Sequence, residues 1–179
     1  MSSYLKYMGD TNYISLSPTT AVVGHDGWYD AQHGDPHSSR VVLTDWYKIG
    51  EFWPHNGPGD VIARARALAH AGATHVMNGI KAAVRYANNI IVLTHFPPWP
   101  EVATYRGQQS DADHLPWYTD KFMGDMLAQA ATAFPDKRFT VLCGHSHGAA
   151  TKQVAPNMVA YCGEAWYGRP QFQRLIEIV

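Results

Sequence analysis

Three histidines stand at the ends of two apolar segments of the sequence. His95 follows the run IIVLT, and His145 and His147 follow the run TVLC within the sequence GHSHG. Imidazole is the commonest metal ligand and the usual proton carrier near neutral pH. Three neutral imidazoles that meet at one point would form a site for a transition-metal ion. The chemistry therefore depends on whether the fold brings these side chains together.

Both apolar segments are predicted to be buried strands of one sheet. Residues 89–95 (NIIVLTH) and 138–145 (RFTVLCGH) are continuous apolar runs of strand length, which is typical of strands covered on both faces. Residues 119–134 between them have the pattern of a helix. A strand–helix–strand unit places the carboxyl ends of both strands at the same edge of an open sheet, where functional groups gather. The three histidines are therefore predicted to converge at this edge.

Each of these histidines also has a simpler interpretation when it is taken singly. A histidine after a strand is more often a hydrogen-bonded core or surface residue, and alternate residues of an extended segment face opposite ways. Gly144 and Gly148 would let the chain bend so that both histidines of GHSHG face a common centre. The combination of THFPP and GHSHG at two strand ends favours a metal site formed by His95, His145 and His147.

The rest of the chain alternates between predicted strands, helices and loops. The expected elements are strands at 12–17 and 20–24, a loop at 25–40, a helix at 41–53 ended by Pro54, a long helix with Asp60 as its N-cap and Gly72 and Gly79 as candidate interruptions, a long loop at 96–117, and three strands within 151–179. This order predicts one α/β domain over residues 1–179, with a mixed sheet.

Composition excludes several classes of protein. Hydrophobic residues make up 46% of the 179 residues, charged residues make up 16%, and the formal net charge is −1, so the chain is globular and has no basic footprint for nucleic acid. It has no apolar run long enough to span a membrane and no apolar signal-peptide core near Met1. Cys143 and Cys162 are too few for a disulfide framework and are predicted to be buried thiols of a cytoplasmic protein.

Four segments resemble the calcineurin-like metallophosphoesterases. THFPPW (94–99) and CGHSHG (143–148) are similar to the last two signature blocks of that family. VVGHDGWYDAQHGD (22–35) resembles the segment after the family's Asn-His block, and NMVAYCGEAWYGRP (157–170) resembles its closing strands. The resemblance covers most of the chain. It implies an α/β/β/α sandwich that holds two divalent metal ions, commonly manganese, iron or zinc, and cleaves phosphomonoesters or phosphodiesters. By this resemblance His95 and His145 would bind one metal ion and His147 the other.

The sequence departs from the family at its beginning. The family's Asp-x-His, Gly-Asp-x-x-Asp and Gly-Asn-His blocks supply the other ligands, a bridging Asp and a catalytic His, and none precedes the matching region here. Asp35-Pro36-His37 has the letters of the first block but follows a loop. The chain therefore resembles the C-terminal half of the sandwich, and we expect that fold to be incomplete. Three neutral imidazoles offset none of the charge of two cations, so we expect one weakly held ion, or none.

Two further pairs of residues are candidates for contacts with the substrate. His25 and Asp26 follow the predicted strand 20–24, and they either support the site or contact the substrate, or else form a simple turn beside Gly27. In the long loop, Arg106 could grip a phosphate and Trp99 could stack on a ring. The simpler interpretation, a solvated Arg106 and a Trp99 that anchors the loop, is favoured.

These observations predict a metal-dependent hydrolase of a phosphorylated substrate, or part of one. If half of the sandwich is missing, apolar sheet surface and a strand edge would be exposed to solvent. We therefore also expect self-association, or a partner chain, to cover this surface. One alternative is a non-catalytic scaffold or regulatory protein of the same fold. Another is a hydrolase with Ser146 as its nucleophile, but no G-x-S-x-G elbow surrounds that residue.

Overall fold

Apolar strand segments and amphipathic helices alternate along the chain and assemble into an α/β fold. The computed structural model describes residues 6–53 and 58–178. Its elements are η1 (Met8–Asp10), β1 (Ile14–Ser15), β2 (Thr20–Gly24), α1 (Asp45–Lys48), η2 (Gly50–Phe52), α2 (Pro58–Ala83), β3 (Asn89–Leu93), η3 (Pro100–Val102), β4 (Thr104–Tyr105), β5 (Gln108–Gln109), α3 (Leu115–Tyr118), α4 (Lys121–Ala133), β6 (Arg138–Cys143), β7 (Ala150–Ala155) and β8 (Met158–Cys162).

Six of the strands form one mixed sheet, as the sequence predicted. Its order is β1-β2-β3-β6-β8-β7, with β2, β3, β6 and β8 parallel and the two outer strands antiparallel to their neighbours. In the register of the central strands, Leu93 lies opposite Gly24 on one side and Leu142 on the other. The segments that follow β2, β3 and β6 therefore begin at one edge of the sheet.

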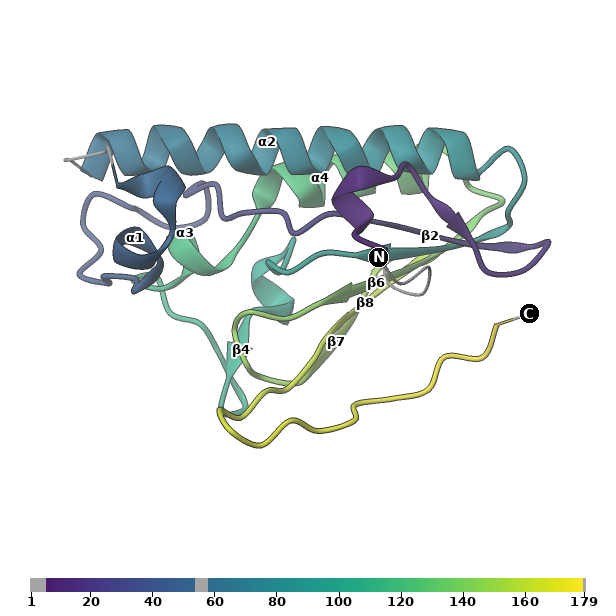
Figure 1. Cartoon of the computed structure of the whole chain (residues 1–179). Helices are drawn as coiled ribbons and strands as arrows, with labels where there is room; N and C mark the ends of the chain where they lie inside the picture. The colour runs from purple at the N-terminus through teal and green to yellow at the C-terminus, as the bar shows by residue number, and fades with distance from the viewer. Residues whose placement is uncertain (1–5, 54–57, 179) are drawn as a thin grey trace.

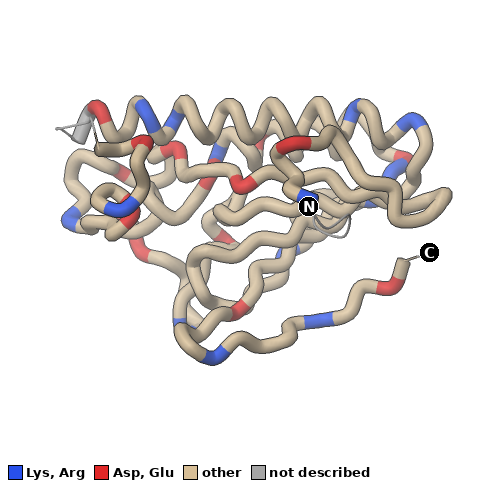
Figure 2. The backbone as a smooth tube through the Cα atoms, in the orientation of Figure 1, with Lys and Arg blue, Asp and Glu red and all other residues tan. Residues whose placement is uncertain are grey.

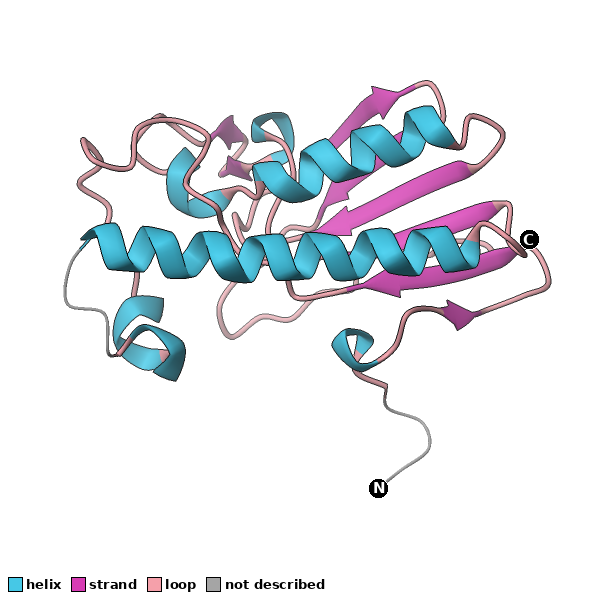
Figure 3. Cartoon of the chain, turned by 90° about the horizontal axis from the view of Figure 1, so that it is seen from above, coloured by secondary structure: helices cyan, strands magenta, loops and turns pink. Residues whose placement is uncertain are grey.

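Two helices cover one face of the sheet. Figures 1 and 3 show α2 and α4 side by side on that face, above the strands in the view of Figure 1. Val76 and Ile80 of α2, Leu127 of α4, and Val92 and Phe139 of the central strands belong to one core cluster and are fully buried or nearly so. Burying a side chain of this size stabilises the fold by about 1.5–3 kcal/mol, so this layer holds the central strands rigidly.

The C-terminal segment crosses the opposite face of the sheet. Residues 163–178 run beneath the strands in Figure 1 and form no regular element, so the prediction of a third strand in the tail is wrong. The segment lies over the sheet face, and its backbone therefore has no neighbouring strand to pair with. Its Arg174 guanidinium stacks 3.8 Å from the centre of the Tyr161 ring. Leu142, Tyr161, Gln173 and Arg174 are among the residues that line a cavity of about 560 Å³ between this segment and the sheet.

The long helix α2 runs without a break from Pro58 to Ala83. Asp60 lies in its first turn, so it is not the N-cap that the sequence predicted. Gly72 and Gly79 do not interrupt the helix. A Cβ at Gly72 would lie 2.9 Å from His25 Nδ1, and one at Gly79 would overlap the Asn12 carbonyl, so both glycines permit close packing on α2.

The shorter elements differ from their predictions in extent. The strand expected at 12–17 forms only at Ile14–Ser15. The helix expected at 41–53 divides into α1 and η2, because Ile49 is extended with φ −98° and ψ 122°. Pro54, its predicted stop, lies outside the described residues. The loop expected at 96–117 contains η3 and a hairpin of β4 and β5.

The distribution of charged residues agrees with the nearly balanced net charge of the sequence. In the described part of the chain, basic and acidic residues are interspersed over the elements (Figure 2). None of the helices described there, including α2, has both the length and the apolar character needed to cross a bilayer. Cys143 and Cys162 are free thiols in the interior, as predicted.

Candidate functional site

His95 and His145 meet at the carboxyl edge of β3 and β6. The pairing of these strands continues beyond their ends, because Thr94 N donates to Leu142 O at 3.0 Å and Gly144 N donates to His95 O at 2.9 Å. The His145 Nδ1 atom consequently lies 3.2 Å from His95 Nε2, with the two rings 5.0 Å apart. The sequence prediction that these side chains converge agrees with this arrangement.

His147 opens onto the same pocket. Its side chain joins those of His95 and His145 in the lining of a cavity of about 470 Å³, which we call the histidine pocket. The His147 ring lies 4.9 Å from that of Tyr167 in an edge-on contact. Asp45, at the start of α1, also lines this pocket.

The backbone of GHSHG bends at its histidines. We expected Gly144 and Gly148 to supply the bends, but the left-handed conformation falls on His145 (φ 61°) and His147 (φ 64°). This conformation costs roughly 1–2 kcal/mol for a residue with a Cβ. Such strained residues cluster at functional sites. Gly148 has another role, since a Cβ there would overlap the carbonyl of Thr104.

Ser146 belongs to the lining of the histidine pocket, but its side chain is buried. It is 1% exposed, and its Oγ lies 3.5 Å from Cys162 Sγ. A hydroxyl buried against a thiol cannot approach a substrate that enters from solvent. The arrangement therefore disfavours Ser146 as a nucleophile.

Desolvation disfavours the charged forms of His145 and His95 in this pocket. It lowers the pKa of His145 to about 3, with further lowering by the neighbouring His95 and His147. Removal of water also lowers the pKa of His95, although Asp26 and Asp45 act in the opposite direction. Neutral imidazole is the form that binds a metal ion.

The nitrogen atoms of His95 and His145 fit one cation. Two nitrogens bound to a tetrahedral Zn²⁺ at 2.0–2.1 Å lie roughly 3.3 Å apart, close to the separation of 3.2 Å between His95 Nε2 and His145 Nδ1. The other nitrogen of His145, Nε2, is buried without a hydrogen-bond partner among the described residues. Within residues 6–53 and 58–178, no three His, Cys, Asp or Glu side chains form a complete metal-binding group. His95 and His145 thus offer two nitrogen atoms at a separation that would suit one cation, and His147 and Asp45 in the same pocket lining are candidates for further ligands.

His25 and Asp26 follow β2 and are hydrogen-bonded through their backbone to the segment that carries His95. The backbone N–H of His95 donates to Asp26 O at 3.0 Å, and His25 N donates to Leu93 O at 3.0 Å. Asp26 Oδ2 accepts a hydrogen bond of 2.8 Å from the Tyr7 hydroxyl, which raises the pKa of Tyr7. His25 and Asp26 line a separate cavity of about 360 Å³ that also touches His95. These contacts favour a supporting role for the pair.

Trp99 and Arg106 lie outside the lining of the histidine pocket. Trp99 is partly buried against the core cluster. Arg106 is exposed at the turn between β4 and β5, where its guanidinium lies 5.2 Å from the centre of the Tyr105 ring. These positions favour the simpler interpretation of both residues.

Sequence reasoning missed three residues of the pocket. Asp45, Tyr118 and Tyr167 line it, and the Tyr118 ring lies 5.1 Å from that of His145. They come from α1, α3 and the C-terminal segment, which tertiary packing alone brings to this edge. Tyr167 lies in the quoted segment 157–170, but nothing in the local sequence marks it, Asp45 or Tyr118 as a pocket residue.

A scan against protein-family models and a search of curated proteins both found no match to this chain. The resemblance to the calcineurin-like metallophosphoesterases therefore rests on the quoted motifs.

Proposed function

We propose that this chain is a metal-dependent phosphoester hydrolase, or the part of one that carries its histidine ligands. The observation that supports this most strongly is the separation of 3.2 Å between His95 Nε2 and His145 Nδ1, in a pocket that His147 shares. A bound divalent cation supplies Lewis-acid polarisation of a phosphoryl oxygen and lowers the pKa of a bound water. A pocket of about 470 Å³ has the size of a small-molecule site.

The chain's own residues would bind and orient both the cation and the phosphoryl group. His95 and His145 would hold the cation, and the Asp45 carboxylate would offset part of its charge. The hydroxyls of Tyr118 and Tyr105, which line the same pocket, are donors for phosphoryl oxygens. The removal of water around His145 strengthens each of these interactions.

The balance of charge limits the site to about one cation. Asp45 is the carboxylate among the lining residues of the histidine pocket, and Asp26 approaches from the neighbouring cavity. Two divalent cations carry four positive charges and need more carboxylates than these. We therefore expect the chain alone to bind one Zn²⁺ or Mn²⁺ weakly and to hydrolyse phosphoesters slowly.

We infer that the six-stranded sheet and its helix layer correspond to half of an α/β/β/α sandwich. Support comes from the C-terminal segment on the other face, where Trp166, Phe172 and Leu175 are 51%, 77% and 86% exposed. Several exposed apolar side chains in one segment make that segment a candidate interaction surface. A second copy or a partner chain would cover them, and analytical ultracentrifugation should find species of at least twice the chain mass. A monomer at high dilution would count against this inference.

An activity assay tests the proposed function. Full-length protein with Mn²⁺ or Zn²⁺ should hydrolyse p-nitrophenyl phosphate slowly, and EDTA, His95→Asn or His145→Asn should abolish the reaction. His37→Asn is the matched control, because His37 is exposed and lies outside the pocket lining. Turnover that survives both EDTA and the pocket variants would refute the proposal.

A non-catalytic scaffold of the same fold is the second candidate. The lining of the histidine pocket includes one carboxylate, Asp45, which is fewer than two-metal chemistry needs, and this favours the scaffold. A scaffold would bind no stoichiometric cation and would show no metal-dependent turnover, so metal analysis combined with the same assay separates the two.

A further inference from the structure

A second pocket adjoins the histidine pocket. This cavity of about 400 Å³ is lined by side chains that include Tyr105, Ser110, Asp111, His114 and Tyr118, and we call it the tyrosine pocket. Tyr105 and Tyr118 also line the histidine pocket, so the two cavities share a wall. A ligand with one group in each cavity would pass beside these two rings.

A tight hairpin forms one side of the tyrosine pocket. Arg106 (φ 50°) and Gly107 (φ 78°) connect β4 to β5, and two left-handed residues in a two-residue loop are the mark of a type I′ turn. Ser110 N then donates to Ala103 O at 2.8 Å and closes the hairpin base. Tyr105, next to the turn, keeps 49% of its surface exposed, which leaves ring area for stacking.

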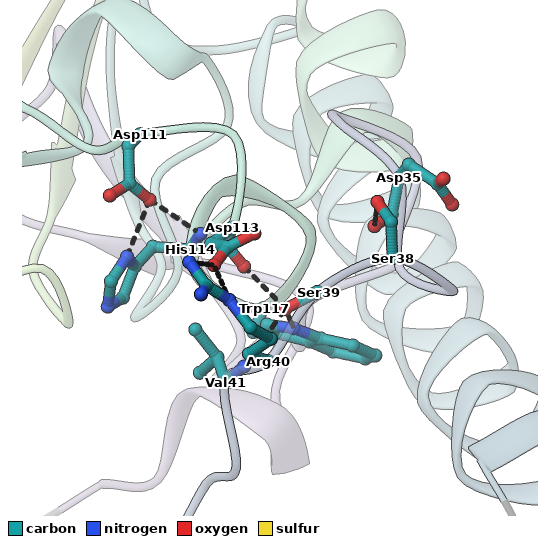
Figure 4. A network of polar contacts seen from close by, with 9 residues as sticks. All are labelled: Asp35, Ser38, Ser39, Arg40, Val41, Asp111, Asp113, His114 and Trp117. Carbon is teal, nitrogen blue, oxygen red and sulfur yellow. Dashed lines mark hydrogen bonds and ion pairs between the residues drawn. The ribbon is translucent and has the colours of Figure 1, made fainter.

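A polar network fixes the other side of the pocket (Figure 4). Ser39 Oγ donates to Asp113 O at 2.7 Å and accepts from Trp117 Nε1 at 2.7 Å, while Arg40 pairs with the Asp113 carboxylate at 3.2 Å. These contacts join the segment before α1 to the segment before α3. The pocket wall is therefore held in place before any ligand binds.

Polar residues also belong to the lining of the tyrosine pocket. Asp111 Oδ1 lies 2.6 Å from His114 Nδ1, and Figure 4 shows this pair side by side. Its hydrogen bonds with His114 lower the pKa of Asp111. Ser110 Oγ is buried and has no hydrogen-bond partner among the described residues. A buried hydroxyl left unpaired costs about 1–3 kcal/mol, which a ligand with a polar edge would recover.

We propose that the tyrosine pocket binds the base of a nucleoside monophosphate whose phosphoryl group enters the histidine pocket. This inference rests on the proposed function and names its substrate class. A planar heterocycle stacks on tyrosine rings and offers donors and acceptors to Ser110 Oγ, whereas a phenyl ring would leave that hydroxyl unpaired. The net charge of −1 and the interspersed charges favour a single nucleotide over a nucleic acid strand.

Adenosine without a phosphate tests the pocket independently of the phosphoryl site. In NMR spectra of full-length protein labelled in its histidine and tyrosine rings, adenosine should shift the signals of His114 and Tyr118. Ser110→Ala should weaken adenosine binding at least fivefold. Asp125→Asn is the control, because Asp125 is an exposed carboxylate of α4 outside the lining of both pockets, and it should leave the affinity unchanged.

The phosphate is then added as a separate arm of the experiment. With Zn²⁺ present, adenosine monophosphate should bind at least tenfold more tightly than adenosine, and His145→Asn should remove that advantage. Equal affinities for adenosine monophosphate and adenosine would count against the phosphoryl site but would leave the proposed base pocket unaffected. Absence of adenosine shifts at His114 and Tyr118, or unchanged affinity in Ser110→Ala, would overturn the base pocket whatever the phosphate does.

Discussion

The imidazoles of His95 and His145 meet at an interplanar angle of 78°, with Nε2 of the first 3.2 Å from Nδ1 of the second, although 50 positions separate them in the chain. Parallel pairing of β3 with β6 produces this contact, because the register aligns Leu93 with Leu142 just before both histidines. The left-handed backbone at His145 then turns its ring toward His95. The contact is thus a property of the sheet edge.

The close approach of Gly148 to Thr104 should make that glycine intolerant of a side chain. We expect Gly148→Ala to lower the free energy of unfolding by about 1–3 kcal/mol, since the new Cβ would overlap a backbone carbonyl that cannot move freely. Gly50→Ala is the control, because a Cβ at Gly50 meets no atom within 4 Å, and it should change stability by about 0.5 kcal/mol or less. Urea denaturation measures both, and equal effects would contradict the proposed clash.

Stability should fall when the buried histidines are forced to accept protons. Burial lowers the pKa of His25, His33 and His145 in the folded state. The unfolded chain, with histidine pKa values near about 6.5, then binds more protons than the folded chain as the pH drops below that value. This contribution to stability is therefore fully present above about pH 6.5 and is lost as the pH falls. The urea midpoint should be lower at about pH 5 than at about pH 7.5, and a midpoint that rises on acidification would refute this.

Asp120 should have the opposite pH dependence. Burial raises the pKa of its carboxyl well above the usual range, while Oδ1 accepts from Met123 N at 3.0 Å and caps α4. Ionisation in the folded state is therefore costly, and that cost grows as the pH rises from about 3.9 through the folded pKa. Asp120→Asn retains a capping oxygen and should be more stable than wild type at neutral pH, with the difference closing in acid. Asp120→Ala removes the cap and should lose about 1 kcal/mol relative to the Asn variant in the same urea titration.

Arg106 should be dispensable for phosphate binding. Its guanidinium lies over Tyr105, outside the lining of the histidine pocket. Asn is well suited to the left-handed φ of 50° at this turn, and that gain roughly balances the loss of an exposed cation–π contact of about 0.5–1 kcal/mol. Arg106→Asn should therefore leave both stability and the affinity for inorganic phosphate unchanged. A tenfold loss of affinity for inorganic phosphate, measured by calorimetry, would show that Arg106 binds the anion.

The sequence predicted the features that follow from local patterns. Continuous apolar runs marked β3 and β6, and their strand–helix–strand order placed His95 beside His145. Local patterns could not locate Asp45, because its place in the pocket depends on how α1 packs in the folded chain. The tail illustrates a different limit, since residues 171–178 alternate like a strand but lie over the sheet face without a partner strand.

Glycine roles were the least predictable part of the site. Gly144 and Gly148 flank the histidines and suggested flexible bends, yet the backbone places the left-handed conformation on the histidines themselves. Gly148 is needed because it has no side chain, and the hairpin at Thr104 can therefore approach its backbone closely. A close approach of this kind depends on a segment more than forty positions away and leaves no local trace.

Binding of Co²⁺ or Zn²⁺ to full-length protein tests the central claim most directly. We expect about one equivalent of cation per chain, with His95→Asn and His145→Asn each weakening binding at least tenfold and His37→Asn having no effect. Co²⁺ absorption should show nitrogen ligation that disappears in both pocket variants. A chain that binds no cation, or that binds it equally well without His95 and His145, would contradict the account.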